Sequence, residues 1–109
     1  MGNNYNGTNI NGEYLLVELE KYWDSEAINF EDRDILVSGT YEEVFKEFSR
    51  RKKQVEDYHR NFKITNTNPF NRPDMFIERE GKDYFTVYYP HAIAKSTYKI
   101  VKNEKGCVL

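Results

Sequence analysis

A helix start at Thr40 is the feature that most constrains how this chain folds. Glu43 follows three residues later. This spacing is typical of a capping box, in which the threonine and glutamate side chains each bind an otherwise unpaired backbone amide of the first helical turn. Apolar side chains then recur at spacings of three and four, although the cationic run 50–53 interrupts them. We therefore predict a helix over about 41–60 that buries one face.

Short segments rich in apolar and β-branched residues flank this helix. Before it, 33–38 has the pattern of a strand, whereas 13–23 fits one face of a strand and one face of a helix equally well. We favour the strand, because 33–38 offers a partner with which it can pair. After the helix we expect a loop over 63–74, a hairpin of 75–80 and 83–89 around Gly81-Lys82, and a last strand over 96–102.

The order of these segments predicts the fold class. At 109 residues the chain fits one domain. We expect residues 1–12, which carry no charge and five Asn, to be a flexible N-terminal tail, and 13–109 to form a single α+β domain. In that domain one long helix packs on a mainly antiparallel sheet in the order ββαβββ, since this arrangement buries the apolar stripes of both.

Composition excludes several classes of protein. Nine Tyr, seven Phe and one Trp are more aromatic residues than a disordered chain carries, and a single cysteine excludes a disulfide scaffold. No apolar run approaches the roughly 18–20 residues of a membrane span, and the N-terminus lacks the pattern of a signal peptide. We therefore expect a soluble cytoplasmic protein that has no membrane among its partners.

Charge is distributed unevenly along the chain. Residues 13–47 carry eleven acidic and three basic side chains, whereas residues 48–109 carry seven acidic and thirteen basic ones. If the fold keeps these two sets apart, the protein presents one negative and one positive surface, and each steers a complementary partner. The alternative is that the acidic connector 24–34 and the helix cations neutralise one another.

The chain has no grouping of reactive side chains that identifies an enzyme. His59 and His91 form no metal-ligand spacing with Cys107 or with carboxylates, and no glycine-rich phosphate loop is present. We therefore predict no metal and no cofactor, and we interpret the protein as non-enzymatic. If it were catalytic, His91 would be the best candidate for a general base.

These features favour a binding protein that acts through contacts with another protein. We expect the acidic connector and the tyrosines of 83–89 to make the contacts, because tyrosine buries a large area and keeps a polar tip. The predicted partner-binding residues are Asp24, Glu26, Glu31, Asp32, Asp34, Tyr84, Tyr88 and Tyr89. The eleven Asn, with many Lys, Ile and Tyr, are typical of AT-rich coding, from which we hypothesise a phage or mobile-element accessory protein that modulates or inhibits a host macromolecule.

Nucleic acid is the alternative partner. A cationic run on the helix can contact phosphates, and aromatic side chains on a sheet can stack on bases. The residues that would carry this activity are Arg50, Arg51, Lys52 and Lys53. Against this interpretation, such a cluster is usually a solvated helix surface, and the chain shows no recognised nucleic-acid motif.

Overall fold

The computed structural model describes residues 12–22 and 30–103, and within them the side chains of all residues but 22 and 30–32. The predicted tail 1–12 therefore lies outside the described residues, except for Gly12. The elements are β1 (Tyr14–Tyr22), β2 (Phe30–Gly39), α1 (Tyr41–Thr65), β3 (Phe76–Glu80), β4 (Tyr84–Tyr89) and β5 (Ala94–Lys102). One helix between two groups of strands confirms the predicted α+β class and the ββαβββ order.

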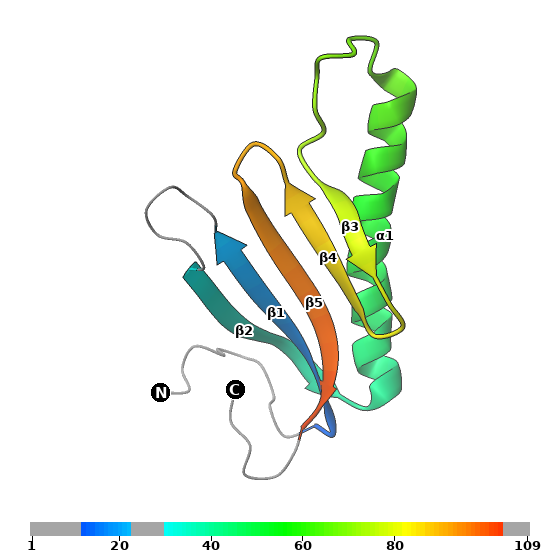
Figure 1. Cartoon of the computed structure of the whole chain (residues 1–109). Helices are drawn as coiled ribbons and strands as arrows, with labels where there is room; N and C mark the ends of the chain where they lie inside the picture. Colours follow the sequence, from blue (N-terminus) through cyan, green and yellow to red (C-terminus); the bar gives the residue numbers. More distant parts are fainter. Residues whose placement is uncertain (1–11, 23–29, 104–109) are drawn as a thin grey trace.

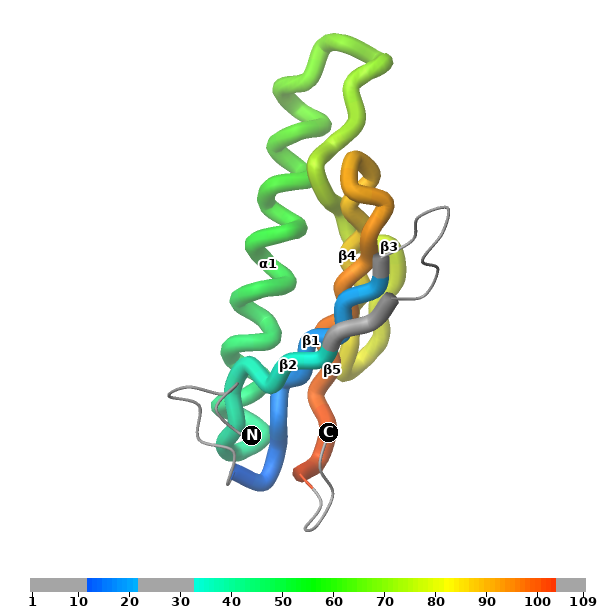
Figure 2. Tube along the Cα trace, turned by 90° about the vertical axis from the view of Figure 1, so that its left-hand side faces the viewer, coloured from blue at the N-terminus to red at the C-terminus, as the bar shows by residue number. Residues whose placement is uncertain are grey.

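The five strands form one antiparallel sheet in the order β2-β1-β5-β4-β3 (Figure 1). The chain leaves the sheet at one edge strand, β2, and α1 carries it to the other edge strand, β3. Figure 2 shows α1 lying on one side of the sheet. In the part of the chain that the structure describes, no second helix covers the other side.

The first segment is a strand, as we favoured, and it occupies an inner position. β1 pairs with β2 on one edge and with β5 on the other, so its backbone groups are hydrogen-bonded on both sides. Its side chains alternate between the two faces of the sheet. Leu16 is fully buried under α1, whereas Leu15 and Val17 form a second apolar cluster with Ile35 on the opposite face.

The capping box begins α1 as predicted. The Thr40 hydroxyl accepts a hydrogen bond from the Glu43 amide at 3.1 Å, and the Glu43 carboxylate accepts one from the Thr40 amide at 2.9 Å. The helix then continues to Thr65, five residues beyond the predicted end at position 60. It passes that position because no glycine or proline occurs before Pro69, and it ends where the Asn66 amide donates to the Phe62 carbonyl.

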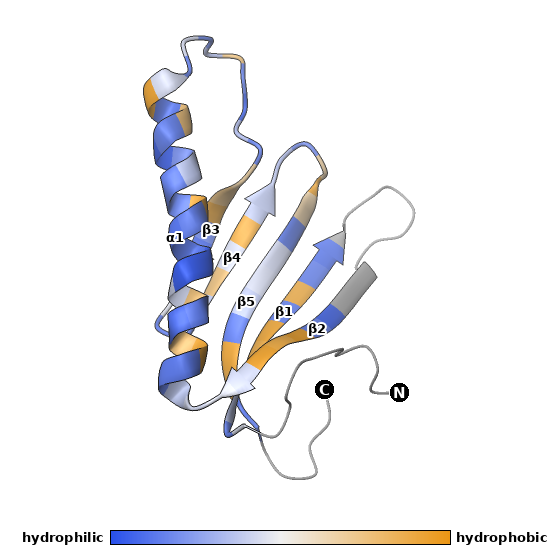
Figure 3. Ribbon diagram, turned by 180° about the vertical axis from the view of Figure 1, so that it is seen from behind, coloured by the Kyte–Doolittle hydropathy of each residue, from blue (hydrophilic) through white to orange (hydrophobic). Residues whose placement is uncertain are grey.

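The core lies between α1 and the sheet. Val44, Phe48 and Val55 of the helix pack against residues of the inner strands, and the Phe85 ring lies 5.2 Å from that of Phe48 and 4.9 Å from that of Tyr98 between centroids. The strand residues buried in this core are Leu16, Phe85, Val87 and Ile100. Seen from its solvent side, α1 is largely hydrophilic (Figure 3). No helix in the described ranges is long and apolar enough to cross a membrane.

Two irregularities in the pairing adjust where side chains point. Leu16 pairs with Val37 and Val17 with Ile35, which leaves Leu36 as the extra residue of a bulge in β2. Because of this bulge, Leu36 and Val37 both pack against the core. In β3 the corresponding extra residue is Glu78. Strand β2 also begins earlier than predicted, at Phe30, so residues 30–34 belong to a strand and not to the acidic connector.

Candidate binding face

Alternation along β1 and β2 sorts charges onto the two faces of the sheet. In β1, Glu18 and Glu20 point to the side of α1, whereas Lys21 points away from it, because successive side chains of a strand face opposite ways. The register extends this pattern to β2, where Asp34 lies beside Glu18 and Arg33 lies beside Leu19. The sequence left open whether acidic and basic side chains occupy separate surfaces. In this part of the sheet, they lie on its two opposite faces.

The face that points away from α1 is rich in cations. Residues directly paired across strands share a face, and this rule places β5 residues 95, 97 and 99 and β3 residue 79 with Lys21. We call the resulting surface the basic face and define it by Lys21, Arg33, Arg79, Lys95 and Lys99. Four of these side chains belong to exposed residues, and Lys95 is partly buried. On the strands, Glu78 is the one carboxylate of this face whose side chain the structure describes.

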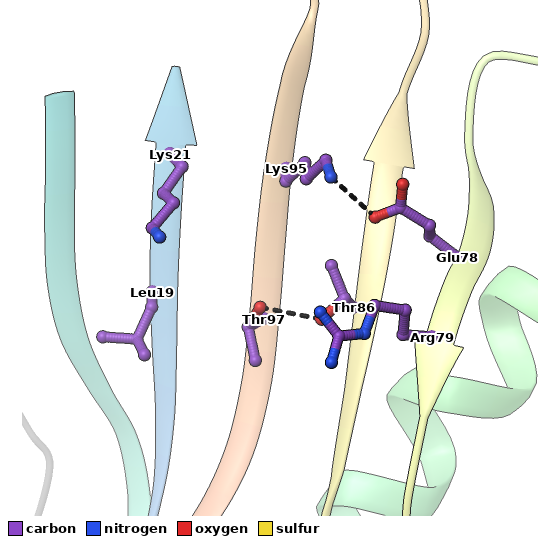
Figure 4. Close-up of a pocket in the computed structure, with 7 residues that line it drawn as sticks. All are labelled: Leu19, Lys21, Glu78, Arg79, Thr86, Lys95 and Thr97. Atoms are coloured by element: carbon purple, nitrogen blue, oxygen red, sulfur yellow. Dashed lines mark hydrogen bonds and ion pairs between the residues drawn. The ribbon is translucent and has the colours of Figure 1, made fainter. Parts of the chain in front are cut away.

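A hollow of about 320 Å³ lies in the middle of the basic face, with Leu19, Lys21, Glu78, Arg79, Thr86, Lys95 and Thr97 around it (Figure 4). The Thr86 and Thr97 hydroxyls form a hydrogen bond of 2.9 Å across β4 and β5. The Lys95 ammonium lies 2.9 Å from the Glu78 carboxylate, which the β3 bulge directs toward this face. The hollow thus combines donors, acceptors and positive charge, and its size is at the lower end of small-molecule sites.

Aromatic side chains stand at the side of this hollow. Tyr84 and Tyr88 are on β4, two residues before and two residues after Thr86, and both are partly exposed. The Tyr88 ring lies 5.8 Å from the Lys95 ammonium and meets the Phe76 ring edge to face at 5.7 Å. Next to it is Ile93, 53 % exposed, whose φ of 51° is unusual for a β-branched residue.

The other face carries an acidic patch, formed by Glu18, Glu20 and Asp34, where α1 leaves β1 and β2 uncovered (Figure 3). Burial raises the pKa of Glu18, although a hydrogen bond from the Tyr98 hydroxyl acts in the opposite direction. The nearby carboxylates of Glu20 and Asp34 raise it further. Burial and the nearby Glu18 carboxylate raise the pKa of Tyr98, so its hydroxyl stays a hydrogen-bond donor.

The cationic run predicted for nucleic acid is engaged in ion pairs within the protein. Arg50 and Arg51 both bind Glu47, at 2.6 and 2.7 Å, and the Arg50 guanidinium lowers the pKa of the Glu47 carboxyl. Lys53 binds Asp57 one turn along the helix, at 2.8 Å. Lys52 joins the helix to the sheet through Glu80 at 2.5 Å. The Arg51 guanidinium also lies over the Tyr98 ring at 5.9 Å, so these cations face neighbours on α1 and on its side of the sheet.

The residues predicted to bind a protein partner are not gathered on one surface. Tyr84 and Tyr88 are on the basic face, whereas Tyr89 is on the side of α1, toward Glu18 and Glu20. Asp34 belongs to the acidic patch. Two of the predicted residues, Asp24 and Glu26, lie outside the described residues, and the backbones of Glu31 and Asp32 lie in β2.

Sequence reasoning missed the cations of the basic face. The available signal was the strict alternation Glu18-Leu19-Glu20-Lys21 and the Arg33-Asp34 pair. Alternation assigns charges to faces only when the segment is known to be a strand, and 13–23 fitted a helix as well. Arg79, Lys95 and Lys99 join them only through the sheet order, which brings β5 beside β1.

The two histidines have different surroundings. His59 lies on α1 against the Phe76 ring at 5.6 Å, and burial, together with Lys63, lowers its pKa. The His91 ring is 3.7 Å from the Asp74 carboxylate and 3.3 Å from the Arg72 carbonyl, at an exposed turn. Within residues 12–22 and 30–103, no group of three or more His, Cys, Asp or Glu side chains is placed to hold a metal. Cys107 lies outside this part of the chain.

Comparison with protein-family models, with curated proteins and with solved structures finds no match to this chain. What the protein does must therefore be inferred from its own residues.

Proposed function

We propose that this chain is a binding protein without catalytic chemistry, and that its basic face receives a negatively charged macromolecule. One observation carries the proposal. The whole chain has a formal net charge of −2, yet one face of its sheet gathers five cations, including Arg33, Arg79 and Lys99, from four different strands. Such a concentration of cations on an acidic protein indicates a surface for an anionic partner.

Because the two faces of the sheet carry opposite charge, an anionic partner approaches the basic face. At physiological ionic strength an exposed charge acts over about 8 Å, so the cations of one face and the acidic patch of the other are felt separately at their own surfaces. An anionic chain is attracted to Lys21 and Lys99 and repelled by Glu18 and Glu20. Binding is thereby confined to one side of the sheet.

An acidic protein surface is the second candidate for this partner, and Ile93 favours it. This exposed aliphatic side chain stands beside Tyr88, and a contact between proteins usually has an apolar centre surrounded by polar residues. Such a partner would agree with the hypothesis that the chain serves a phage or mobile element by modulating a host macromolecule.

Retention on an immobilised polyanion such as heparin tests the proposal. The variant Lys21→Glu/Lys99→Glu reverses two exposed charges of the basic face. The control Lys46→Glu/Lys63→Glu reverses two exposed charges of α1 and gives the protein the same net charge. We expect the first variant to elute at a much lower salt concentration than the wild type and the control to elute close to it.

Equal elution of the two variants would show that net charge alone governs retention, and the basic face would then lose its special role. A wild-type protein that passes the column at low ionic strength would also contradict the proposal, since phosphate- or sulfate-bearing polymers bind most tightly in dilute salt.

A further inference from the structure

We propose that the basic face binds a single-stranded nucleic acid, with phosphates on its cations and bases on Tyr84 and Tyr88. This inference rests on the proposed function, because it names the class of partner that the basic face receives. It uses a different surface from the helix run 50–53, whose side chains are paired with Glu47, Asp57 and Glu80.

The cations surround the hollow in an arrangement suited to a flexible anionic chain. Lys21 and Arg33 lie on its β1 and β2 side, and Arg79 lies on its β3 side, with Lys99 further along β5. These four side chains are exposed, so a phosphate can reach them without rearrangement of the sheet. Contacts of this kind position a nucleic acid without reading its sequence.

The aromatic residues lie on the same face as the cations. Along β4, the side chains directed toward the basic face are Tyr84, Thr86 and Tyr88 in succession, which places hydroxyls between two partly exposed rings. Four residues of a strand span about 13 Å, so each ring can receive a separate base. Stacking on such rings tolerates every base, because each base has a flat π-surface.

The hollow at Thr86 adds hydrogen-bonding groups. The Thr86 and Thr97 hydroxyls lie at its floor, and the Arg79 guanidinium extends over β4 toward them (Figure 4). A volume of about 320 Å³ accommodates a sugar or a base edge beside these groups. The face therefore offers three kinds of contact that a nucleotide needs: positive charge, a flat ring and polar donors.

A single strand fits these features better than a duplex or an acidic protein. The bases of a duplex are stacked within the helix, so they are not available to Tyr84 or Tyr88. Lysine is depleted at contacts between proteins relative to the rest of the surface, whereas three of the five cations here are lysines. A sheet face that carries aromatic and basic side chains is a common platform for unpaired bases.

Fluorescence anisotropy with three labelled probes tests the inference on the full chain. The probes are a short single-stranded oligonucleotide, the corresponding duplex and polyglutamate. We expect the wild type to bind the single strand more tightly than the other two. The variant Tyr84→Leu/Tyr88→Leu should lose the affinity for the single strand by about tenfold or more while its binding of polyglutamate and duplex changes little.

Two further variants separate stacking from other effects. Tyr84→Phe/Tyr88→Phe keeps both rings and should retain single-strand binding. Phe70→Leu replaces an aromatic ring that is 90 % exposed in the loop after α1 and should change nothing. Circular dichroism establishes that each variant is folded. If the leucine variant does not fold, the preference of the wild type for a single strand over polyglutamate decides the inference.

The outcomes also separate this inference from the proposed function. If polyglutamate binds as tightly as the oligonucleotide and the leucine variant behaves like the wild type, the face receives anions but not bases, and the inference is wrong while the proposed function stands. If none of the three probes binds, both are wrong.

Discussion

Removing two cations from the basic face should weaken the salt dependence of oligonucleotide binding by a defined amount. The variant is Lys21→Ala/Lys99→Ala, in which both side chains are exposed. Alanine removes the charge without introducing an opposite one. The slope of log K against log salt then reports the number of phosphates still neutralised.

The expected slopes follow from the cations of the basic face. Lys95 is paired with Glu78, so four exposed cations remain for phosphates. Each phosphate of a single strand that a cation neutralises contributes about −0.7 to the slope, so four cations give about −2.8 and two give about −1.4. Between about 50 mM and 200 mM salt, the wild type should lose affinity about 50-fold and the variant about 7-fold. This difference is well within the resolution of a titration.

The assay is fluorescence anisotropy of a labelled single-stranded oligonucleotide at a series of NaCl concentrations. Lys46→Ala/Lys63→Ala is the matched control, since it removes two exposed charges from α1 and changes the net charge equally. Its slope should stay near that of the wild type. Equal slopes for the wild type and the basic-face variant, or an equal decrease in both variants, would refute the assignment of phosphates to this face.

Three further predictions concern stability. Phe85→Ala should lower the free energy of unfolding by about 3–5 kcal/mol, because the ring is fully buried between Phe48 and Tyr98, and a loss below about 1 kcal/mol in urea denaturation would contradict this packing. Thr40→Ala should cost about 1 kcal/mol through loss of the capping bond, and Thr40→Ser should restore most of it. Burial raises the pKa of Glu18 above 4.5 in the folded protein, so the folded state holds this proton more tightly than the unfolded chain does and its stability falls as pH rises through that range. Glu18→Gln should therefore be more stable than the wild type near pH 7 and lose this advantage on acidification below the unfolded pKa; a gain that is independent of pH would point to another cause.

Local signals predicted the elements well. The capping box fixed the start of α1 at Tyr41, and the alternation of apolar residues located every strand after it to within two residues at either end. The end of α1 was predicted five residues too early, because the predicted loop was begun at position 63. Nothing before Pro69 stops a helix, and Phe62 continues the apolar stripe past position 60. The start of β2 was placed three residues too late, at position 33. Phe30 and the charged residues 31 and 32 show no strand pattern of their own, and they extend β2 by pairing with β1.

The candidate surface was far less predictable. Uneven charge along the chain was visible, and it led to the connector and to the run 50–53 as separate surfaces. In the folded protein that run is paired with carboxylates of α1 and β3, while Tyr89 is on the opposite face from Tyr84 and Tyr88. Whether a charged side chain forms an ion pair depends on which residues the fold brings next to it. A local sequence pattern does not show this.

The sequence by itself determined where hydrogen-bonded segments begin and which side chains within a segment share a face, because capping and the periods of helix and strand act over a few residues. Only the tertiary structure decided which side chains of different strands lie together on one face of the sheet. The order β2-β1-β5-β4-β3 sets Lys21 beside Lys95, 74 positions further along the chain, and near Arg79, 58 positions further, through pairings across β5 and β4. Because α1 crosses from one edge of the sheet to the other on a single side, the basic face carries no helix among residues 12–22 and 30–103.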